Sequence, residues 1–294
     1  EKIARGTGVR GLINIQFAYV SENLYVIEAN PRASRTVPFV SKATGVQLAK
    51  AAVLIGLGKT IAELKAEGYL PQHMDGASLP QETAIAVKAA VLPFARFRTP
   101  EGVVVDSLLS PEMRSTGEVM GLDQHFDTAF AKAQAGAGSP MPTSGKVFIS
   151  VANHDKRNVI IYAKMLESLG FEIVSTGGTA EILRRNGLNS ILVASKFAEA
   201  NGDHSIVDMV RNGDIDLILN TPAGGAARSD GYEIRAAAVS VGCPVMTTIS
   251  EFAAAVQAIT ALREHSWDIM SLQEHDVKLA AAVDARLASE GGEA

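Results

Sequence analysis

The chain has 294 residues, of which 47% are hydrophobic and 20% are charged, and its formal net charge is −5 at pH 7. A chain of this length can bury one large or two moderate cores, and length alone favours two domains. The mild negative charge gives no electrostatic reason to expect a nucleic acid or a membrane surface as a partner. The single cysteine, Cys243, excludes an internal disulfide framework and favours a cytoplasmic protein, and no apolar run reaches membrane-spanning length.

The first informative segment is Ile13–Thr36, which reads INIQFAYVSENLYVIEANPRASRT. Two runs rich in β-forming residues, Leu12–Val20 and Leu24–Glu28, flank the polar turn Ser21-Glu22-Asn23. This pattern predicts an antiparallel pair of strands.

Three polar side chains of this hairpin are expected on one face. Glu28 and Asn30 share a face because side chains alternate along a strand, and Gln16 of the partner strand joins them. An ordinary solvated strand end is the alternative, but Glu28 closes the apolar run LYVI, and a carboxylate at the end of a buried strand needs a partner. Oxygen donors of low total charge suit magnesium. Arg32 and Arg35 come directly after the hairpin, and their guanidinium groups could bind phosphate oxygens through paired N–H donors. The segment therefore predicts a magnesium and phosphate site.

The elements expected next are, in chain order, a helix pair over Val40–Leu64, a surface insertion over Glu67–Thr83, and β-like runs over Ala84–Phe97, Val103–Leu109 and Arg114–Met120. Residues 134–145 are small, flexible and punctuated by two prolines, which is typical of a domain junction. We therefore predict a first domain over 1–133, a linker over 134–145 and a second domain over 146–294.

The second half alternates apolar runs with helix-like stretches. The runs are Lys146–Val151, Phe171–Ser175, Ser190–Val193, Asp216–Leu219 and Pro244–Thr247, and the helices begin near Lys156, Thr179, Ser205, Asp230 and Ile249. This order predicts right-handed βαβ units and an α/β fold with a doubly wound parallel sheet. Ligands of such sheets bind beyond the carboxyl ends of the strands.

The strongest element at these strand ends is the sequence STGGTA at Ser175–Ala180. Its two glycines let the backbone approach an anion, while hydroxyls and the first amides of the following helix donate to it. The alternative is a purely structural glycine-rich turn that is capped by Thr179, and the sequence of the turn alone does not distinguish it from an anion-binding site. Lys156 and Lys196 follow two other strands and favour a phosphate monoester as the ligand.

The strings NIQF, YVIEANPRASRTVPFVSKATG, VLPF and PEMRSTGEVMG closely resemble the carbamoyl-phosphate-forming half of the large subunit in the carbamoyl-phosphate synthase family of ATP-grasp ligases. The resemblance runs from about Thr7 to the end of the chain and implies that the first domain is the C-terminal part of an ATP-grasp domain, α+β with antiparallel strands. It implies ATP and Mg²⁺ or Mn²⁺ as cofactors. By this resemblance the metal ligands are Gln16, Glu28 and Asn30, and the arginines beside phosphate and carbamate are Arg32 and Arg35.

From Gly145 onward the chain resembles the methylglyoxal-synthase-like domain that closes this large subunit and binds regulatory nucleotides. The resemblance implies a pocket for the phosphate and ribose of UMP, with IMP as a competitor, formed by Lys156, Thr176, Thr179, Lys196, Asn220 and Thr221. Two positions depart from other members, some of which carry Thr where Pro222 stands and Ser near Gly231. Ornithine-responsive members carry Glu and Tyr where this chain has Ala89 and Val245, so we expect ornithine to have little effect.

The resemblance further implies glutamine-dependent synthesis of carbamoyl phosphate for arginine and pyrimidine biosynthesis, with a separate small glutaminase subunit as the partner. The large and small subunits would form a heterodimer, and whether such heterodimers assemble into an oligomer is left open by the sequence. The N-terminus lacks an initiator Met and leads directly into the strand that carries Gln16. We therefore expect a fragment that makes no product alone. Two alternatives remain. The first is an isolated nucleotide-phosphate sensor. The second is a methylglyoxal-synthase-type lyase that uses His154, Asp155 and Lys156, but an enzyme of that kind would not be preceded by the end of an ATP-grasp domain.

Overall fold

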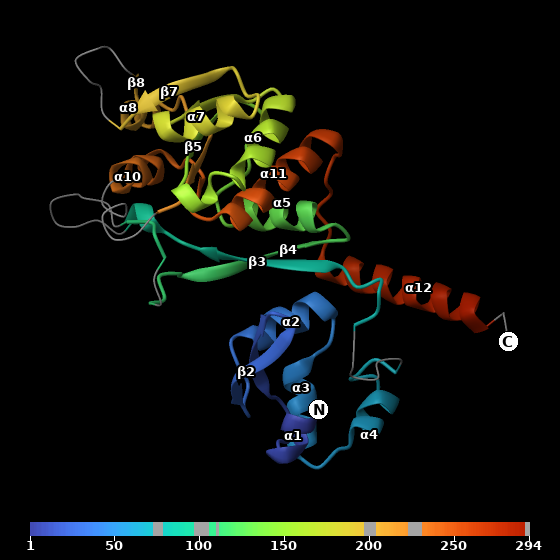
Figure 1. Ribbon diagram of the computed structural model, residues 1–294. Helices are drawn as coiled ribbons and strands as arrows, with labels where there is room; N and C mark the ends of the chain where they lie inside the picture. Colours follow the sequence, from blue (N-terminus) through green and yellow to red (C-terminus); the bar gives the residue numbers. More distant parts are fainter. Residues whose placement is uncertain (73–78, 97–105, 110–111, 197–203, 223–230, 292–294) are drawn as a thin grey trace. The chain divides into compact units, whose positions relative to one another are not determined.

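The computed structural model describes residues 1–72, 79–96, 106–109, 112–196, 204–222 and 231–291 (Figure 1). The chain forms two compact units, one of Glu1–Ala84 with Asp268–Ala294 and one of Ile85–Trp267. Among the described residues, no helix has both the length and the apolar character needed to cross a membrane.

The first unit contains a two-stranded sheet and several helices. Its elements are α1 (Lys2–Gly6), β1 (Asn14–Val20), β2 (Asn23–Asn30), α2 (Thr36–Thr44), α3 (Leu48–Gly56), α4 (Ile61–Ala66) and α12 (Leu272–Gly291). The helix pair expected over residues 40–64 is wrong, because three helices occupy this region. Gly45, at a φ of 70°, ends α2, and Thr60 begins α4 through a capping box with Glu63.

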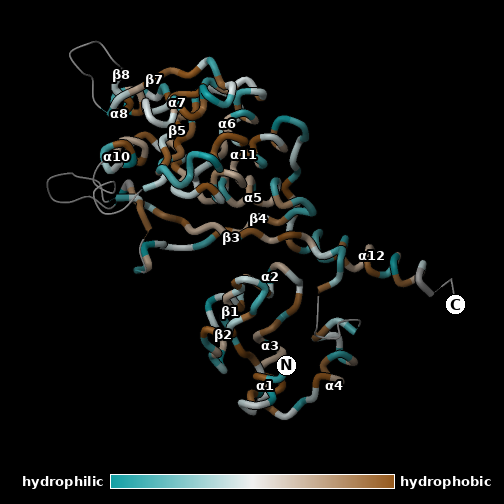
Figure 2. The backbone as a smooth tube through the Cα atoms, in the orientation of Figure 1, coloured by the Kyte–Doolittle hydropathy of each residue, from teal (hydrophilic) through white to brown (hydrophobic). Residues whose placement is uncertain are grey.

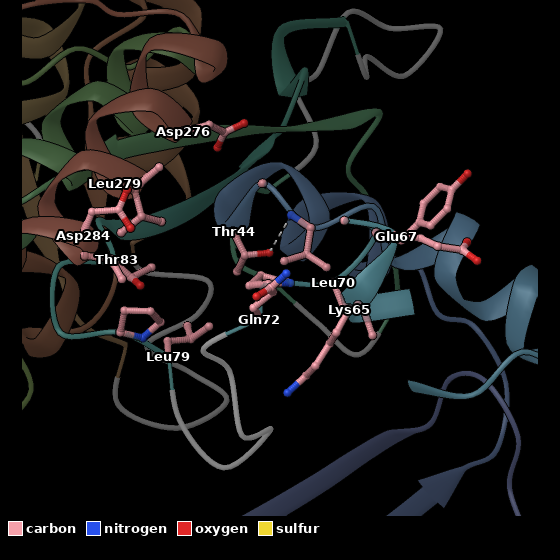
Figure 3. Close-up of a pocket in the computed structure, with 18 of the residues that line it drawn as sticks. Thr44, Lys65, Glu67, Leu70, Gln72, Leu79, Thr83, Asp276, Leu279 and Asp284 are labelled. Atoms are coloured by element: carbon pink, nitrogen blue, oxygen red, sulfur yellow. Dashed lines mark hydrogen bonds between the residues drawn. The ribbon is translucent and has the colours of Figure 1, made fainter. Parts of the chain in front are cut away.

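A cavity of about 610 Å³ lies within this first unit (Figure 3). Thr44, Lys65 and Gln72 line one part of it, and Leu279 and Val283 of α12 line another. Arg286 of the same helix donates to Glu82 at 2.7 Å. The cavity is largely apolar and contains none of the predicted site residues.

The second unit is built on a sheet in which every pairing is parallel. Its strands are β5 (Lys146–Ser150), β6 (Glu172–Ser175), β7 (Ile191–Ser195), β8 (His204–Ser205), β9 (Leu217–Asn220) and β10 (Val245–Met246), in the order β10-β9-β5-β6-β7-β8. The predicted doubly wound sheet is therefore confirmed. Only the short β8 was missed.

Helices cover both faces of this sheet. They are α6 (Val159–Ser168), α7 (Gly177–Arg185), α8 (Ile206–Arg211), α10 (Tyr232–Val241) and α11 (Ile249–Glu264). Val147 and Ile149 pack in a core with α6, α7 and α11, whereas Phe148 packs with α8 and α10. Successive side chains of a strand point to opposite faces, so a strand covered on both faces reads as a continuous apolar run. In Figure 2 the tube beside the β5 and β7 labels is largely brown, the hydrophobic end of the scale.

The second unit also contains an antiparallel pair, β3 (Ile85–Val91) and β4 (Gly117–Asp123), and helix α5 (Phe126–Gly136). Because α5 contacts β3, β4 and α11, these elements lie in one unit with the parallel sheet rather than with the hairpin. The contact division thus differs from the predicted boundary at 134–145, which begins inside α5. The strand expected over 103–109 falls partly outside the described residues, and residues 106–109 form no strand.

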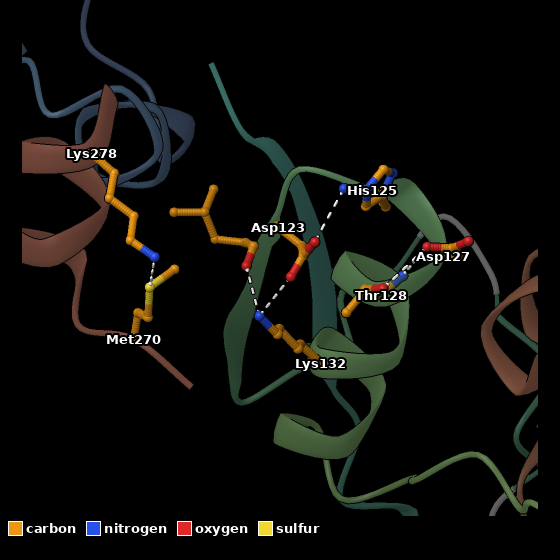
Figure 4. A network of polar contacts seen from close by, with 8 residues as sticks. Asp123, His125, Asp127, Thr128, Lys132, Met270 and Lys278 are labelled. Carbon is orange, nitrogen blue, oxygen red and sulfur yellow. Dashed lines mark hydrogen bonds and ion pairs between the residues drawn. The ribbon is translucent and has the colours of Figure 1, made fainter. Parts of the chain in front are cut away.

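Helix α5 is tied to β4 by a polar network (Figure 4). Lys132 Nζ lies 2.8 Å from Asp123 Oδ2 and also donates to the Leu122 carbonyl, while the His125 amide donates to Asp123 Oδ1 at 3.1 Å. Burial opposes ionisation of the Asp123 carboxyl, but the hydrogen bonds from Lys132 and His125 outweigh it and hold its pKa below the usual value. The carboxylate therefore stays charged and fastens the helix to the strand.

Candidate functional site

The predicted metal ligands lie on the hairpin of β1 and β2. Ser21 and Glu22 form its turn at φ values of 49° and 65°, both in the left-handed region that a two-residue hairpin loop requires. Gln16 pairs directly with Glu28, and the register then shifts so that Phe17 pairs with Val26. The bulge leaves Ile27 without a partner in the ladder, and bulges of this kind commonly re-aim side chains beside functional sites.

The structure brings the three predicted ligands together. Asn30 Nδ2 donates to Glu28 Oε1 at 2.9 Å, and Gln16 lies opposite Glu28 on the neighbouring strand. The donor set is one carboxylate and two amides. Such a set fits Mg²⁺, which binds few protein oxygens and keeps other positions for water and phosphate oxygens.

The hairpin differs from expectation in its burial. Glu28 is exposed, and the preceding apolar residues are exposed as well, with Leu24 at 64% and Ile27 at 65%. The interpretation of Glu28 as the end of a buried strand is therefore wrong, because β1 and β2 pair only with each other in the described part of the chain. The support for a metal site comes instead from the register and from the Asn30 contact.

The two predicted arginines follow the hairpin. Arg32 donates from its guanidinium to the Ala33 carbonyl at 3.0 Å, and its own amide donates to the Asn30 carbonyl at 2.8 Å. Arg35 is the N-cap residue of α2. Both side chains are exposed, so both can turn toward a ligand beside Glu28.

Four of the six residues predicted to bind a nucleotide converge on the end of β5. Thr176 Oγ1 lies 3.2 Å from Ser150 Oγ, and Asn220 Nδ2 donates to the Ser150 carbonyl at 3.4 Å. The amides of the next two residues of the chain, 151 and 152, donate to Thr179 Oγ1 at 3.4 Å and to Thr221 Oγ1 at 2.8 Å. The carboxyl ends of β5, β6 and β9 thus form one polar cluster, as their parallel order requires.

The fifth residue, Lys156, lies at the N-terminus of α7. Its Nζ would be 3.3 Å from a Cβ atom at Gly178, which has none. Thr176 precedes the helix and makes no side-chain cap, and the Thr179 amide donates to the Thr176 carbonyl at 3.0 Å, so the amides that would meet an anion are those of Gly177 and Gly178. An ammonium group, free helical amides and a bare glycine surface together provide a cradle for phosphate.

The sixth residue, Lys196, is held by a residue that the sequence did not single out. Its Nζ lies 2.6 Å from Glu233 Oε2 of α10. The hydrogen bond from Lys196 holds the pKa of Glu233 below its usual value, so this carboxylate stays charged at neutral pH. Lys196 therefore faces a competing carboxylate before any ligand arrives.

Two other functional-looking residues are less informative. His154 is 74% exposed and contacts the neighbouring Asp155 at 3.4 Å. Cys243 is partly buried and donates to the Ile215 carbonyl at 3.3 Å. Burial, with a smaller contribution from Asp216, raises the pKa of the Cys243 thiol to about 12, so the thiol stays protonated and serves packing.

Comparisons with known proteins match two segments of the chain. The model of the carbamoyl-phosphate synthase L chain ATP binding domain matches residues 1–64, and the MGS-like domain model matches residues 158–247. The carbamoyl phosphate synthase large chain of Kocuria rhizophila is 69% identical over 281 residues, which is 95% of this chain. Over nearly all of its length the chain is therefore similar to a part of the carbamoyl phosphate synthase large chain.

Less similar large chains align over a similar share of their length. The large chain of Micrococcus luteus is 65% identical over 286 residues, covering 96% of this chain and 26% of that protein. That of Streptomyces coelicolor is 57% identical over 286 residues, covering 97% and 26%. The chain spans about a quarter of the length of these curated relatives, including the 25% of the Kocuria protein.

Proposed function

We propose that this chain serves in the ATP-dependent phosphorylation of carbamate to carbamoyl phosphate, as part of a glutamine-dependent carbamoyl-phosphate synthase. The observation that carries the proposal is the pairing of Gln16 with Glu28, with Asn30 bonded to Glu28, inside the segment matched by the ATP binding domain model. A small glutamine-hydrolysing subunit would be the partner, and the product would feed arginine and pyrimidine biosynthesis.

The residues of this site fall into two groups, one that would bind a cation and one that would bind anionic oxygens. Gln16, Glu28 and Asn30 would hold Mg²⁺ or Mn²⁺, which would neutralise phosphate charge during the transfer. Arg32 and Arg35 would orient the oxygens of carbamate and of the transferred phosphoryl group through paired N–H donors. Since little covalent chemistry falls to the protein in phosphoryl transfer, these residues act by position and charge.

A chimera tests this proposal. We expect the chain, exchanged for the matching quarter of the Kocuria rhizophila large chain, to support carbamoyl phosphate synthesis, whereas the chain alone forms none. In the chimera, Glu28→Gln should lower the rate at least about 100-fold, because an amide cannot supply the missing charge. Glu22→Gln in the turn of the same hairpin is the matched control and should leave the rate unchanged. A Glu28→Gln chimera as fast as its parent would refute the role of the hairpin.

We also propose that the pocket at the carboxyl ends of β5, β6 and β9 binds a regulatory nucleoside monophosphate, UMP or IMP. The convergence of Thr176, Thr179, Asn220 and Thr221 on the end of β5 supports this, as does Lys156 beside the start of α7. Ala89 and Val245 carry no polar group, in keeping with a weak response to ornithine.

Calorimetric titration of the chain with UMP, IMP, uridine and dihydroxyacetone phosphate separates the candidate functions. We expect UMP and IMP to bind and uridine to bind at least about tenfold more weakly, since it lacks the phosphate that Lys156 and α7 would hold. Dihydroxyacetone phosphate should yield no methylglyoxal. Turnover of the triose phosphate would instead support the lyase alternative, in which His154 and Asp155 take part.

A further inference from the structure

A buried arginine lies directly behind the nucleotide pocket. Arg235 of α10 is fully buried, and its guanidinium donates three hydrogen bonds in the described structure. Nε and Nη2 donate to the two oxygens of Asp106 at 2.8 and 2.7 Å, and Nη1 donates to Asn220 Oδ1 at 2.8 Å. A buried guanidinium needs a compensating charge, and the bidentate Asp106 carboxylate supplies it.

This arrangement fixes the orientation of the Asn220 amide. Arginine is a donor only, so the Asn220 atom that faces it must be the carbonyl oxygen. Nδ2 is thereby turned away from Arg235, and it donates to the Ser150 carbonyl in the pocket at 3.4 Å. Asn220 can therefore address a ligand through N–H and not through its oxygen.

Gly231 leaves the space that this contact needs. A Cβ atom at position 231 would lie 2.5 Å from Asn220 Oδ1 and would overlap the Arg235 guanidinium. The glycine lets α10 begin close enough to β9 for Arg235 to reach Asn220.

We propose that Arg235, anchored by Asp106 and accommodated by Gly231, is a positioning residue that presents Asn220 to the pocket as a hydrogen-bond donor. The pocket then selects a ligand with an oxygen acceptor at that point, such as a phosphate, ribose or carbonyl oxygen of a nucleotide. A ligand with an amino group there would leave Asn220 unsatisfied, which disfavours it. The selection rests on the proposed nucleotide function of the same pocket.

Asn220→Asp is the decisive variant. The carboxylate still accepts from Arg235, so the unfolding midpoint should stay within about 2 °C of the parent. The variant has no N–H to offer and places a negative charge beside the ligand. We expect its affinity for UMP to fall at least about 30-fold.

Gly231→Ala tests the support behind Asn220, with Gly117→Ala as a control at a position where a Cβ atom meets nothing. In ¹⁵N spectra, the Nδ2 signals of Asn220, assigned by their loss in Asn220→Asp, should shift when UMP is added to the parent and to Gly117→Ala. They should shift little in Gly231→Ala, in which UMP affinity falls about tenfold or more. If Gly231 and Arg235 only stabilised the fold, Gly231→Ala would not selectively change the response of the Asn220 Nδ2 signals to UMP.

The outcomes separate the two levels of the proposal. If the parent chain binds neither UMP nor IMP, the proposed nucleotide function fails and the role of Arg235 fails with it. If the parent binds UMP and Asn220→Asp binds it equally well, only the positioning role is overturned.

Discussion

Replacing Gly121 with alanine is expected to destabilise the parallel-sheet unit by at least about 3 kcal/mol. Gly121 lies in β4, where the backbone of α5 crosses directly over it: a Cβ atom there would overlap the Ala129 carbonyl oxygen and lie 2.6 Å from the Ala133 amide nitrogen. Both atoms belong to a helix backbone and cannot turn aside as a side chain does. Helix α5 must therefore move off β4, which also disturbs its contact with α11 and the Lys132–Asp123 pair.

Gly117→Ala in the same strand is the matched control, because nothing lies within 4 Å of a Cβ atom at that position. It should change stability by no more than about 1 kcal/mol, in the stabilising direction if at all. Urea unfolding followed by circular dichroism measures the difference, and hydrogen exchange of the β3 and β4 amides assigns it to this unit. Equal stability of the two variants would show that α5 does not approach β4 this closely.

Patterns local in sequence predicted the elements of the site well. Period-two alternation and a polar turn were enough to place Gln16 opposite Glu28, and the alternation of apolar runs with helices placed Thr176, Asn220 and Thr221 at neighbouring strand ends. The burial of the hairpin was not predictable in this way. An apolar strand shows that something can cover it, but only the packing of other segments decides whether it is covered, and Ile27 is exposed here.

The residues that sequence reasoning missed act through long-range contacts. Asp106 and Arg235 are 129 positions apart and meet only because β4, α5 and the parallel sheet form one unit. Glu233 of α10 reaches Lys196, which directly follows β7. A charged residue inside a helical pattern ordinarily indicates a solvated face, so a fully buried Arg235 becomes visible only when α10 is placed on the sheet. The contact division into two units likewise depends on packing, since the composition of residues 134–145 says nothing about where α5 packs.

The Lys196–Glu233 pair leads to the second large effect, in which neighbouring substitutions act in opposite directions. Lys196→Met should weaken UMP binding about 10- to 100-fold, because a charge-assisted hydrogen bond to phosphate contributes about 1.5 to 3 kcal/mol. Glu233→Gln should tighten it about three- to tenfold. The carboxylate lies 2.6 Å from the ammonium that the phosphate needs, and its lowered pKa keeps it charged at neutral pH.

Calorimetric titration of the two single variants and the double variant measures the coupling. If Glu233 acts by occupying Lys196, the double variant should bind UMP like Lys196→Met, and the gain from Glu233→Gln should shrink as salt screens the partly exposed pair. Glu181→Gln removes a comparable exposed carboxylate, which pairs with Arg185 on α7, and should change the affinity less than about twofold. If Glu233→Gln binds UMP no better than the parent, Glu233 does not compete with the phosphate. A gain from Glu233→Gln that survives in the Lys196→Met background would instead mean that the carboxylate repels the phosphate directly, and that its contact with Lys196 is incidental to binding.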